Sequence, residues 1–596
     1  MTTQPLDFLK EKTSSLLQKY QTCKIMAKNH ASGIKVDKER LIYARSYCSC
    51  IVAAYWNALS KKHKSSIRLR SVPVSVEFIL LSDETKELAS ATGVLISRFP
   101  SEDAGYLIGS IYTVMLPVTY RSDMGAYYTP PPLVSRLLDL SEQAGVDFSK
   151  ASVIDPACGG GAFLAPVALR MLSKEKGSSP EWIFRRLVKR LKGIEIDPFA
   201  AWMSAVLLES VLIKLCIETK RRLPADIIIV GDALTQENIG EFDLVIGNPP
   251  YGRVTLSPEM RSKFSRSLFG HANLYGLFTD LAARFVRPDT GVVAFLTPTS
   301  FLGGQYFTAL RKLLTETMSP LAFDFVTDRD GVFDDVLQET MLTVFKAGQH
   351  KQQTNVSLLI PKGLNKARVE KVGNVYIEKG GKTWLLPRGK QDINFLNRLR
   401  HMPTRLTDLG YSVSTGQLVW NRFKDQLRKS KNAISYPLIW AESITPVGFS
   451  FSAARKNHVP YVEVRQKQEY LLTSKECVLV QRTTSKEQDK RILAALLPQN
   501  FIDISGGVVV ENHINIVYPN GILNHISPEV ISALLNSRVV DRAFRCISGS
   551  VAVSAFELNS IPLPALEQLS ELQMLLNSTS EKELIEEKIA SFYGVV

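Results

Sequence analysis

Long apolar runs are absent from this chain of 596 residues. A membrane-spanning helix needs about 20 apolar residues in a row. The two most apolar stretches are short or interrupted by charge: 106–120, and 199–217 with Glu209 and Lys214 inside it. The first residues are polar and amphipathic, unlike a secretory signal. We therefore expect a cytoplasmic protein with no membrane partner.

Cysteine is also scarce, with seven residues scattered along the chain. An odd and irregularly spaced set does not make a disulfide framework, and Cys48 and Cys50 are too close together for a zinc finger. We expect these thiols to be small buried side chains in a reducing compartment, and we expect no metal site.

Residues 1–121 lack a phosphate-binding loop and a nuclease-like group of acids. Apolar residues at helical spacing over 8–17 and 41–59 predict a mainly helical region, with one β-like stretch over 71–81. The run Asp83-Glu84-Thr85-Lys86 has no partner acid on a preceding strand, so we expect no nuclease here.

Residues 122–350 alternate short β-branched runs with helical patterns, which is typical of a largely parallel sheet covered by helices. Ligands of such sheets bind at the carboxyl ends of the strands, so the chemistry is expected in the loops that follow them. The expected strands are 151–154, 191–196, 227–230, 244–246, 291–295, 323–325 and 341–345.

Residues 351–596 lose this alternation and predict a second, mixed α+β domain. We expect strands over 477–480 and 507–510 and helices over 491–497, 528–535 and 566–593.

Positive charge is concentrated in part of this second domain. The chain carries a formal charge of +14, and residues 390–491 hold 18 basic and 9 acidic side chains together with several aromatic ones. Two explanations stay open: a nucleic-acid surface, in which cations contact phosphates and flat groups contact bases, or a basic domain whose aromatic residues form its core.

The first strand of the sheet runs into a glycine-rich loop, DPACGGGAFL, from Asp155 to Leu164. Glycines at 159–161 allow a ligand to approach the backbone closely. A dinucleotide fingerprint fits poorly, because the third glycine of that motif is missing and the next acidic strand end is too distant. Asp155 would repel a pyrophosphate and suits a cationic ligand, such as a sulfonium with its amino group.

The next two strand ends each carry an acid: Glu195 in GIEIDP and Asp232 in VGDAL. A carboxylate accepts hydrogen bonds from both hydroxyls of a ribose, and a second acid can accept from an adenine amine. Each acid alone could equally cap a helix. Together with the glycine loop they describe a nucleoside pocket without a phosphate-binding group, which predicts S-adenosylmethionine as the cofactor.

The fourth strand ends in Asn248-Pro249-Pro250-Tyr251. Prolines have no N–H and a fixed φ, so this loop presents oxygen acceptors and one amide side chain. Two acceptors there can hold both hydrogens of an exocyclic amine, and Tyr251 supplies a flat face for its ring. Because both hydrogens are held, the lone pair of the amine is directed at the methyl group.

In these motifs and their order, the chain resembles the gamma class of adenine-N6 DNA methyltransferases, the group that contains the Taq methyltransferase. DPACGGGAFL, GIEIDP, GDAL and NPPY look like its cofactor, ribose, adenine and catalytic segments, and 122–596 is the part covered. The resemblance implies a Rossmann-like methyltransferase domain followed by a target-recognition domain. It implies cofactor contacts from Thr129 in GAYYTPPPLV, and from Asp155, Ala157, Gly159, Gly161, Glu195, Ile196, Asp232 and Asn248.

The resemblance also implies residues that contact the substrate. Phe333 in GVFDDVLQETMLTVF would stack on a flipped target base opposite Tyr251, and Ile196 and Pro250 are candidates to cover the adenine of the cofactor. The segment STGQLVWNRFK looks like part of a recognition domain. The DNA-binding candidates are Trp420, Arg422, Lys424 and Arg482.

The function implied is transfer of a methyl group from S-adenosylmethionine to the N6 amine of adenine in double-stranded DNA, in a bacterial restriction–modification system with a separately encoded endonuclease as a candidate partner. Three alternatives stay open: an RNA adenine or protein glutamine methyltransferase, a cytosine-N4 methyltransferase, and a non-catalytic DNA-binding subunit. The recognition sequence and the role of residues 1–121 are not readable from the chain.

Overall fold

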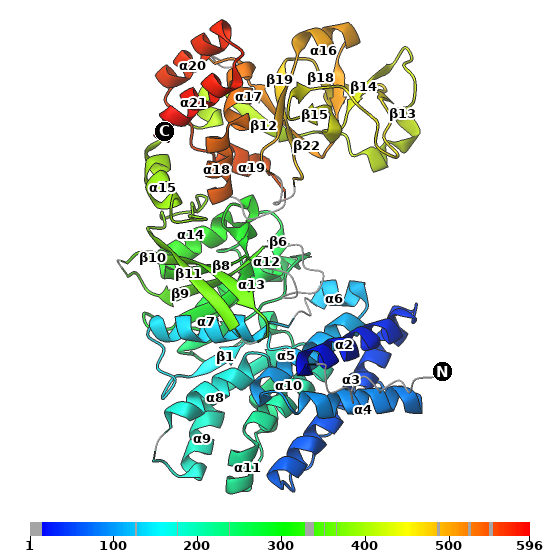
Figure 1. Ribbon diagram of the computed structural model, residues 1–596, viewed down its shortest axis with the longest axis vertical. Coiled ribbons are helices and arrows are strands. Elements are labelled where there is room, and N and C mark those ends of the chain that lie inside the picture. The colour runs from blue at the N-terminus through cyan, green and yellow to red at the C-terminus, as the bar shows by residue number, and fades with distance from the viewer. Residues whose placement is uncertain are drawn as a thin grey trace. The chain divides into compact units, whose positions relative to one another are not determined.

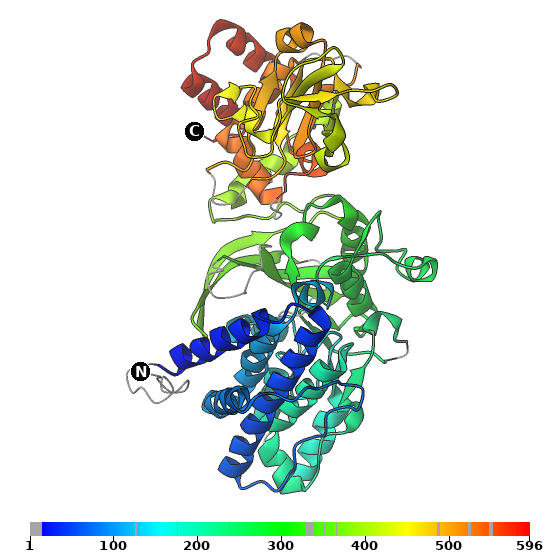
Figure 2. The same cartoon turned by 90° about the vertical axis from the view of Figure 1, so that its right-hand side faces the viewer.

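The computed structural model describes residues 15–124, 128–175, 177–237, 239–327, 339–350, 352–364, 366–484, 489–521, 526–547 and 552–595 (Figures 1 and 2). The chain forms two compact units. Unit 1 comprises Met1–Pro298 and Lys312–Lys371, and unit 2 comprises Thr299–Arg311 and Val372–Val596. Each unit is described by itself.

Unit 1 begins with helices, as the sequence predicts. They are α2 (Leu16–Ser32), α3 (Asp37–His63), α4 (Asp83–Ile96), α5 (Ala104–Met115) and α6 (Val118–Met124). Tyr47, Trp56 and Ile108 are among the residues that form their shared buried core. The strand expected over 71–81 was wrong: this segment has no regular secondary structure, and Val74 and Leu80 are exposed. A β-branched run without a neighbouring strand has no partner for its backbone hydrogen bonds.

A nine-stranded sheet forms the rest of unit 1, in the order β11-β10-β8-β9-β7-β4-β1-β2-β3. All seven predicted strands are present, and the sheet continues through two more. Neighbouring strands from β7 to β3 are parallel, and β9 is antiparallel to both β7 and β8. The strands are β1 (Val153–Asp155), β2 (Leu191–Glu195), β3 (Ile228–Val230), β4 (Leu244–Gly247), β7 (Val292–Pro298), β8 (Met318–Val326), β9 (Thr340–Ala347), β10 (Thr354–Lys362) and β11 (Lys366–Val375).

The order of the strands places the ligand crevice. Successive strands β1, β2 and β3 proceed in one direction, and β4 returns to the other side of β1. Such a reversal opens a crevice at the carboxyl ends of the two central strands. Helices and a short hairpin connect the strands: α7 (Pro131–Gln143), α8 (Leu164–Lys174), α9 (Pro180–Arg190), α10 (Pro198–Val211), α11 (Ile213–Thr219), β5 (Arg253–Val254), α12 (Pro258–Lys263), β6 (Ala272–Asn273), α13 (Leu274–Phe285) and α14 (Thr308–Thr317).

Helix α10 explains the most apolar stretch of the sequence. Ala201, Ala205 and Leu208 belong to the core under the sheet, whereas Phe199 and Met203 belong to the core of the N-terminal helices. A helix covered on both sides is apolar all round. No single helix in the described ranges has the length and apolar character of a membrane span; α10 and α11 reach them only as a pair bent by 72°.

Unit 2 has the mixed α+β character expected of the second domain, but its main segment begins later than residue 351, because β10 and most of β11 belong to the sheet and body of unit 1. One sheet has the order β12-β22-β19-β20 and another the order β13-β17-β14-β21-β18. Its strands are β12 (Tyr411–Thr415), β13 (Leu427–Arg428), β14 (Ser435–Ile439), β15 (Ile444–Thr445), β16 (Gly448–Phe449), β17 (Tyr461–Glu463), β18 (Leu472–Thr473), β19 (Cys477–Gln481), β20 (Ala494–Leu497), β21 (Val508–Val510) and β22 (Ile514–Pro519). Its helices are α15 (Asp392–His401), α16 (Gln499–Ser505), α17 (Pro528–Asn536), α18 (Arg538–Ile547), α19 (Ala555–Asn559), α20 (Leu566–Ser578) and α21 (Lys582–Phe592).

Two helix predictions for unit 2 need correction. The expected helix over 491–497 is wrong, because Ala494–Leu497 forms strand β20, antiparallel to β19. Pairing with a buried neighbour overrides the helical preference of Ala and Leu. The expected C-terminal helix is divided in two, α20 and α21, with Thr579 extended between them. The predicted strands over 477–480 and 507–510 and the helix over 528–535 are confirmed.

Candidate active site at the carboxyl ends of the strands

The glycine-rich loop after β1 forms a tight turn. Gly159 and Gly161 have φ values of +52° and +84°, a region that favours glycine. At Gly160 a side chain would approach the Met203 methyl and the Tyr128 ring to 2.7 Å. The turn therefore brings backbone rather than side chains to the crevice.

Glu195 ties this loop to the end of β2. Its Oε2 accepts a hydrogen bond from the Gly159 amide at 2.8 Å, and its Oε1 accepts one from the Asp197 amide at 3.0 Å. Burial raises the pKa of Glu195 to about 7. The carboxyl is thereby held in one orientation beside the backbone of the cofactor loop.

Asp155 lies underneath the loop. Its side chain is 1% exposed, and Oδ1 accepts from the Ala157 amide at 3.0 Å. A Cβ added at Gly247 would lie 2.6 Å from the same oxygen, so the carboxyl occupies the space before Asn248. Within the described ranges Oδ2 has no hydrogen-bond partner, and burial raises the pKa of Asp155 to about 8. Asp155 thus connects the glycine loop to the loop after β4.

Asp232 begins the short 3-10 helix Ala233–Thr235. Its Oδ1 accepts from the Leu234 amide at 2.9 Å, so it caps this helix while its side chain lines the crevice. Both explanations offered by the sequence, a cap and a ligand group, are compatible with this position.

The Asn-Pro-Pro-Tyr loop follows β4. The Tyr251 hydroxyl donates to Asn248 Oδ1 at 2.7 Å and lies 3.3 Å from the carbonyl oxygen of Leu296. The Tyr251 ring meets Tyr275 edge to face, with ring centroids 6.0 Å apart. The catalytic amide predicted from the sequence is therefore oriented by the tyrosine three residues further on.

These loops surround one cavity of about 420 Å³, a size suited to a cofactor. The predicted cofactor residues on its wall are Thr129, Ala157, Gly159, Glu195, Ile196, Asp232 and Asn248, and Pro250 joins them. Asp155, Gly161, Pro249 and Tyr251 belong to the same loops without lining the cavity. Phe333 lies outside the described residues.

Several wall residues were not predicted. Tyr112 and Tyr120 come from the N-terminal helices, and Tyr128 comes from the segment that carries Thr129. The apolar part of the wall beside Ile196 and Pro250 is extended by further side chains: Leu234, Val254, Leu256, Met260 and Phe278. Only Tyr128 had a sequence signal, since it precedes Thr129 in GAYYTPPPLV.

The cavity fits S-adenosylmethionine. Thr129 is 1% exposed, and within the described ranges its hydroxyl has no hydrogen-bond partner although it lines the cavity. A buried hydroxyl of this kind calls for a polar ligand. The glycine loop admits a close backbone approach, and Glu195 offers an acceptor for ribose hydroxyls. In the part of the chain that the structure describes, no group of three His, Cys, Asp or Glu side chains could hold a metal ion.

Most aromatic residues of the basic window pack inside unit 2. Trp440 is 2% exposed and stacks on His458, with ring centroids 3.8 Å apart. Phe449 and Phe451 pack against a separate buried cluster. These aromatic side chains therefore form part of the core of the domain, which is the second of the two explanations offered for the basic window.

The four DNA-binding candidates differ in their surroundings. Trp420 packs against a buried cluster of unit 2, and the Lys424 ammonium lies 5.3 Å from its ring centroid. Arg422 and Lys424 are exposed. Arg482 is half-buried and donates from Nη1 to the carbonyl oxygen of Asn512 at 3.1 Å.

An open sheet with this strand order, a glycine-cradled cavity and an acid at the second strand end defines an S-adenosylmethionine-dependent methyltransferase fold. Residues 193–333 match the Eco57I restriction-modification methylase family. Over 481 residues the chain is 24% identical to the Type II methyltransferase M.BsuBI of Bacillus subtilis, covering 76% of this chain and 90% of that protein.

A second relative is the Type II methyltransferase M.PstI of Providencia stuartii, 26% identical over 58% of this chain and 69% of that protein. Among solved structures, the Type IIL restriction-modification enzyme MmeI in complex with DNA superposes with a TM-score of 0.52 at 14% identity, over 91% of this chain and 87% of that one. At this identity the likeness shows the fold alone. The family and sequence matches make the chain a DNA methyltransferase of the restriction–modification type, with S-adenosylmethionine as its cofactor.

Proposed function

We propose that the chain methylates the N6 amine of a specific adenine in double-stranded DNA and serves as the modification enzyme of a restriction–modification system. The observation that carries this proposal is the position of Asn248 and Pro250. Both lie on the wall of the cofactor cavity, directly after β4. A reacting amine held by this loop would meet the cofactor at the switch point of the sheet.

The cofactor supplies an electrophilic methyl group on a sulfonium. The target adenine leaves the duplex, at a cost of a few kcal/mol, because its amine cannot reach the cavity from inside the base stack. Asn248 Oδ1 and the carbonyl oxygen of Pro249 accept the two amine hydrogens, and Tyr251 flanks the loop that holds the base. Orientation and exclusion of water provide most of the rate acceleration, and no covalent enzyme intermediate is required.

Cys158, the cysteine within the cofactor loop, plays no nucleophilic part in this proposal. Burial raises the pKa of Cys158 well above its usual range, so the thiol stays protonated at neutral pH. Its Sγ lies 3.6 Å from the Ser204 hydroxyl behind the loop.

The alternatives differ in the substrate. Glutamine and RNA adenine methyltransferases use similar loops, but the separate basic unit after the sheet favours DNA. A cytosine-N4 enzyme is chemically close, although Ser is more usual there than Asn248. A non-catalytic subunit would not need Glu195, Asp232, Asn248 and Tyr251 together at one edge of the sheet.

The deciding experiment is incubation of the full chain with S-adenosylmethionine and unmethylated bacterial DNA, followed by mass spectrometry of the nucleosides. We expect N6-methyladenine, after which sequencing would locate the modified site. N4-methylcytosine alone would keep the fold and overturn the assignment of the base. If the chain bound the cofactor but methylated no base, DNA alone would not be a sufficient substrate. The next candidates would then be an RNA substrate, a protein substrate or a missing subunit.

A further inference from the structure

A buried carboxylate just after strand β2 joins the N-terminal helices to the cofactor site. Asp197, 5% exposed, follows β2 by two residues. Its Oδ1 accepts from Arg45 of α3 at 3.0 Å, and its Oδ2 accepts from the Tyr112 hydroxyl of α5 at 3.0 Å. Two helices that are distant in sequence from the methyltransferase motifs thus meet at the residue that caps α10.

Asp197 is hydrogen-bonded to Glu195, the acid expected to bind the ribose of the cofactor. The backbone N–H of Asp197 donates to Glu195 Oε1, whose other oxygen accepts from Gly159. Arg45 thus holds the side chain of Asp197, and the backbone of the same residue holds Glu195, which in turn binds the cofactor loop. Because the Asp197 side chain fixes the turn whose N–H binds Glu195, we expect loss of the guanidinium to loosen the Glu195 carboxyl.

Tyr120 of α6 reaches the same end of the cavity. It is half-buried and lines the cavity together with Glu195 and Asp197. Burial, with the nearby Asp197 carboxylate, raises the pKa of Tyr120 to about 12, so its hydroxyl is a neutral donor at working pH. Arg45 Nη2 lies 3.5 Å from this oxygen, which places the phenol beside the same network.

We propose that Tyr120 is a cofactor-binding residue that hydrogen-bonds the ribose end of S-adenosylmethionine, and that Arg45 positions Glu195 for the same ligand through Asp197. The N-terminal helices are then part of the cofactor site and not an independent module. This inference rests on the methyltransferase function but is independent of which base is methylated.

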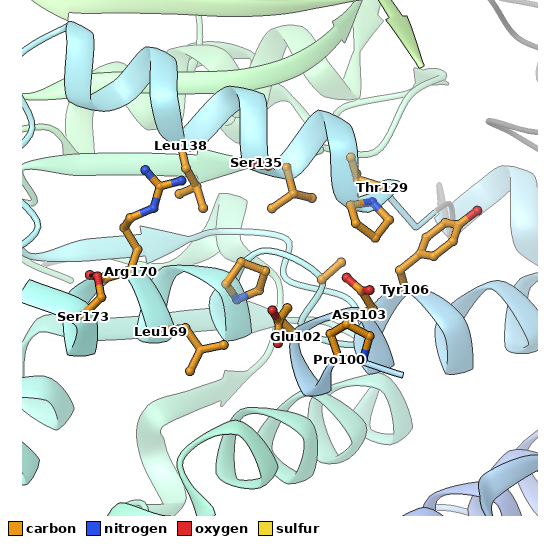
Figure 3. Close-up of a pocket in the computed structure, with 14 residues that line it drawn as sticks. Pro100, Glu102, Asp103, Tyr106, Thr129, Ser135, Leu138, Leu169, Arg170 and Ser173 are labelled. Carbon is orange, nitrogen blue, oxygen red and sulfur yellow. Dashed lines mark hydrogen bonds between the residues drawn. The ribbon is translucent and has the colours of Figure 1, made fainter. Parts of the chain in front are cut away.

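A second cavity of about 390 Å³ contains a tyrosine, Tyr106, that can serve as a matched control for Tyr120 (Figure 3). It borders the cofactor cavity at Thr129 and Ala162 and is lined on one side by Glu102, Asp103 and Tyr106. Tyr106 belongs to α5, like Tyr112, and does not line the cofactor cavity. Loss of its hydroxyl tests the general cost of a Tyr-to-Phe change in this region.

The experiment is calorimetric titration of the full chain with S-adenosylmethionine and with methylthioadenosine, which keeps the ribose but lacks the amino-acid end. Tyr120→Phe should weaken both ligands about five- to tenfold, the loss of one hydrogen bond, and Tyr106→Phe should weaken neither. Equal binding by Tyr120→Phe and the unmodified chain would overturn the inference. A loss confined to S-adenosylmethionine would overturn the assignment to the ribose end.

The positioning role of Arg45 is tested with two substitutions. Arg45→Met should weaken both ligands at least fivefold, and Arg45→Lys should recover most of that loss, because a lysine can reach a single carboxylate oxygen. Thermal unfolding of the same samples checks that each variant folds. Unchanged affinity in a folded Arg45→Met protein would overturn the positioning role. If the unmodified chain bound neither ligand, the proposed function itself would fail.

Discussion

The strand-end loops of unit 1 and the basic window of unit 2 use similar side chains in opposite ways. At the strand ends, Glu195 and Asn248 make short hydrogen bonds within the protein and still line a cavity. In the basic window, Arg428 forms a two-pronged pair with Glu463, and Trp440 is buried against His458. Composition alone therefore does not separate residues that line a site from residues such as Arg428 and Trp440, which stabilise the fold through contacts within the protein.

Removing the Asn248 amide, the proposed catalytic group, is the strongest test of the strand-end loops. Asn248→Ala should lower the methylation rate at least ~100-fold, by analogy with the loss of one transition-state hydrogen-bond partner. Cofactor affinity should stay nearly unchanged although Asn248 lines the cavity, since the other wall groups, among them Glu195 and the glycine loop, remain intact. Single-turnover methylation and calorimetry measure the two quantities. Asn57→Ala, on the exposed face of α3, is the control; near-full turnover in Asn248→Ala would remove Asn248 from its role.

Substitutions of exposed cations and of ion-paired cations in the basic window should differ in their effect on the salt dependence of DNA binding. Arg422→Ala with Lys424→Ala removes two exposed charges. The slope of log affinity against log salt should fall by about 2, roughly 0.9 for each lost phosphate contact. Arg428→Ala, whose guanidinium already pairs with Glu463, should destabilise unit 2 and leave the slope unchanged. Equal slopes in all three proteins would place the DNA surface elsewhere.

The bond between Tyr251 and Asn248 predicts a smaller effect on catalysis. Tyr251→Phe keeps the ring but removes the donor to Asn248 Oδ1, so the amide becomes less well oriented. The maximal methylation rate should fall about three- to tenfold, within the range of one neutral hydrogen bond, with little change in the Michaelis constant for DNA. Tyr376→Phe, at an exposed position, is the control. An unchanged rate would mean that the hydroxyl does not position the amide.

The buried acid under the loops predicts a dependence of stability on pH. Because burial raises the pKa of Asp155 to about 8, the folded chain holds a proton that the unfolded chain releases near pH 4. The free energy of unfolding should therefore fall as the pH rises between these values.

Asp155→Asn removes the pH-dependent contribution of this carboxyl group to the free energy of unfolding of the cofactor-free protein. The melting temperature of the variant relative to the unmodified chain should be higher at pH 8 than at pH 5, by at least ~2 °C. Asp147→Asn, at an exposed carboxyl whose pKa is lowered by hydrogen bonds from Ser149, should show no such change over this range. If the melting temperatures of Asp155→Asn and the unmodified chain differed by the same amount at pH 5 and at pH 8, this result would contradict the raised pKa.

Local pattern was sufficient for most of the sheet. Each predicted strand of unit 1 is a short, largely apolar run, as expected of strands buried on both faces of a sheet, and the first four are followed directly by a glycine or an acid. The segments 71–81 and 491–497 failed because their state depends on a distant partner. The first found no strand to pair with, and the second paired with β19.

The sequence alone determined the order of the motifs, the strand ends that carry them and the cofactor class, because these depend on spacing along one backbone. Tertiary structure alone decided which groups meet across long separations. It brought Arg45 and Tyr112 onto Asp197, placed the Asp155 carboxyl before Asn248 and buried Trp440. Side chains of helices far away in sequence come together only when the cores close, and the energy of such contacts leaves no periodic signal in the chain.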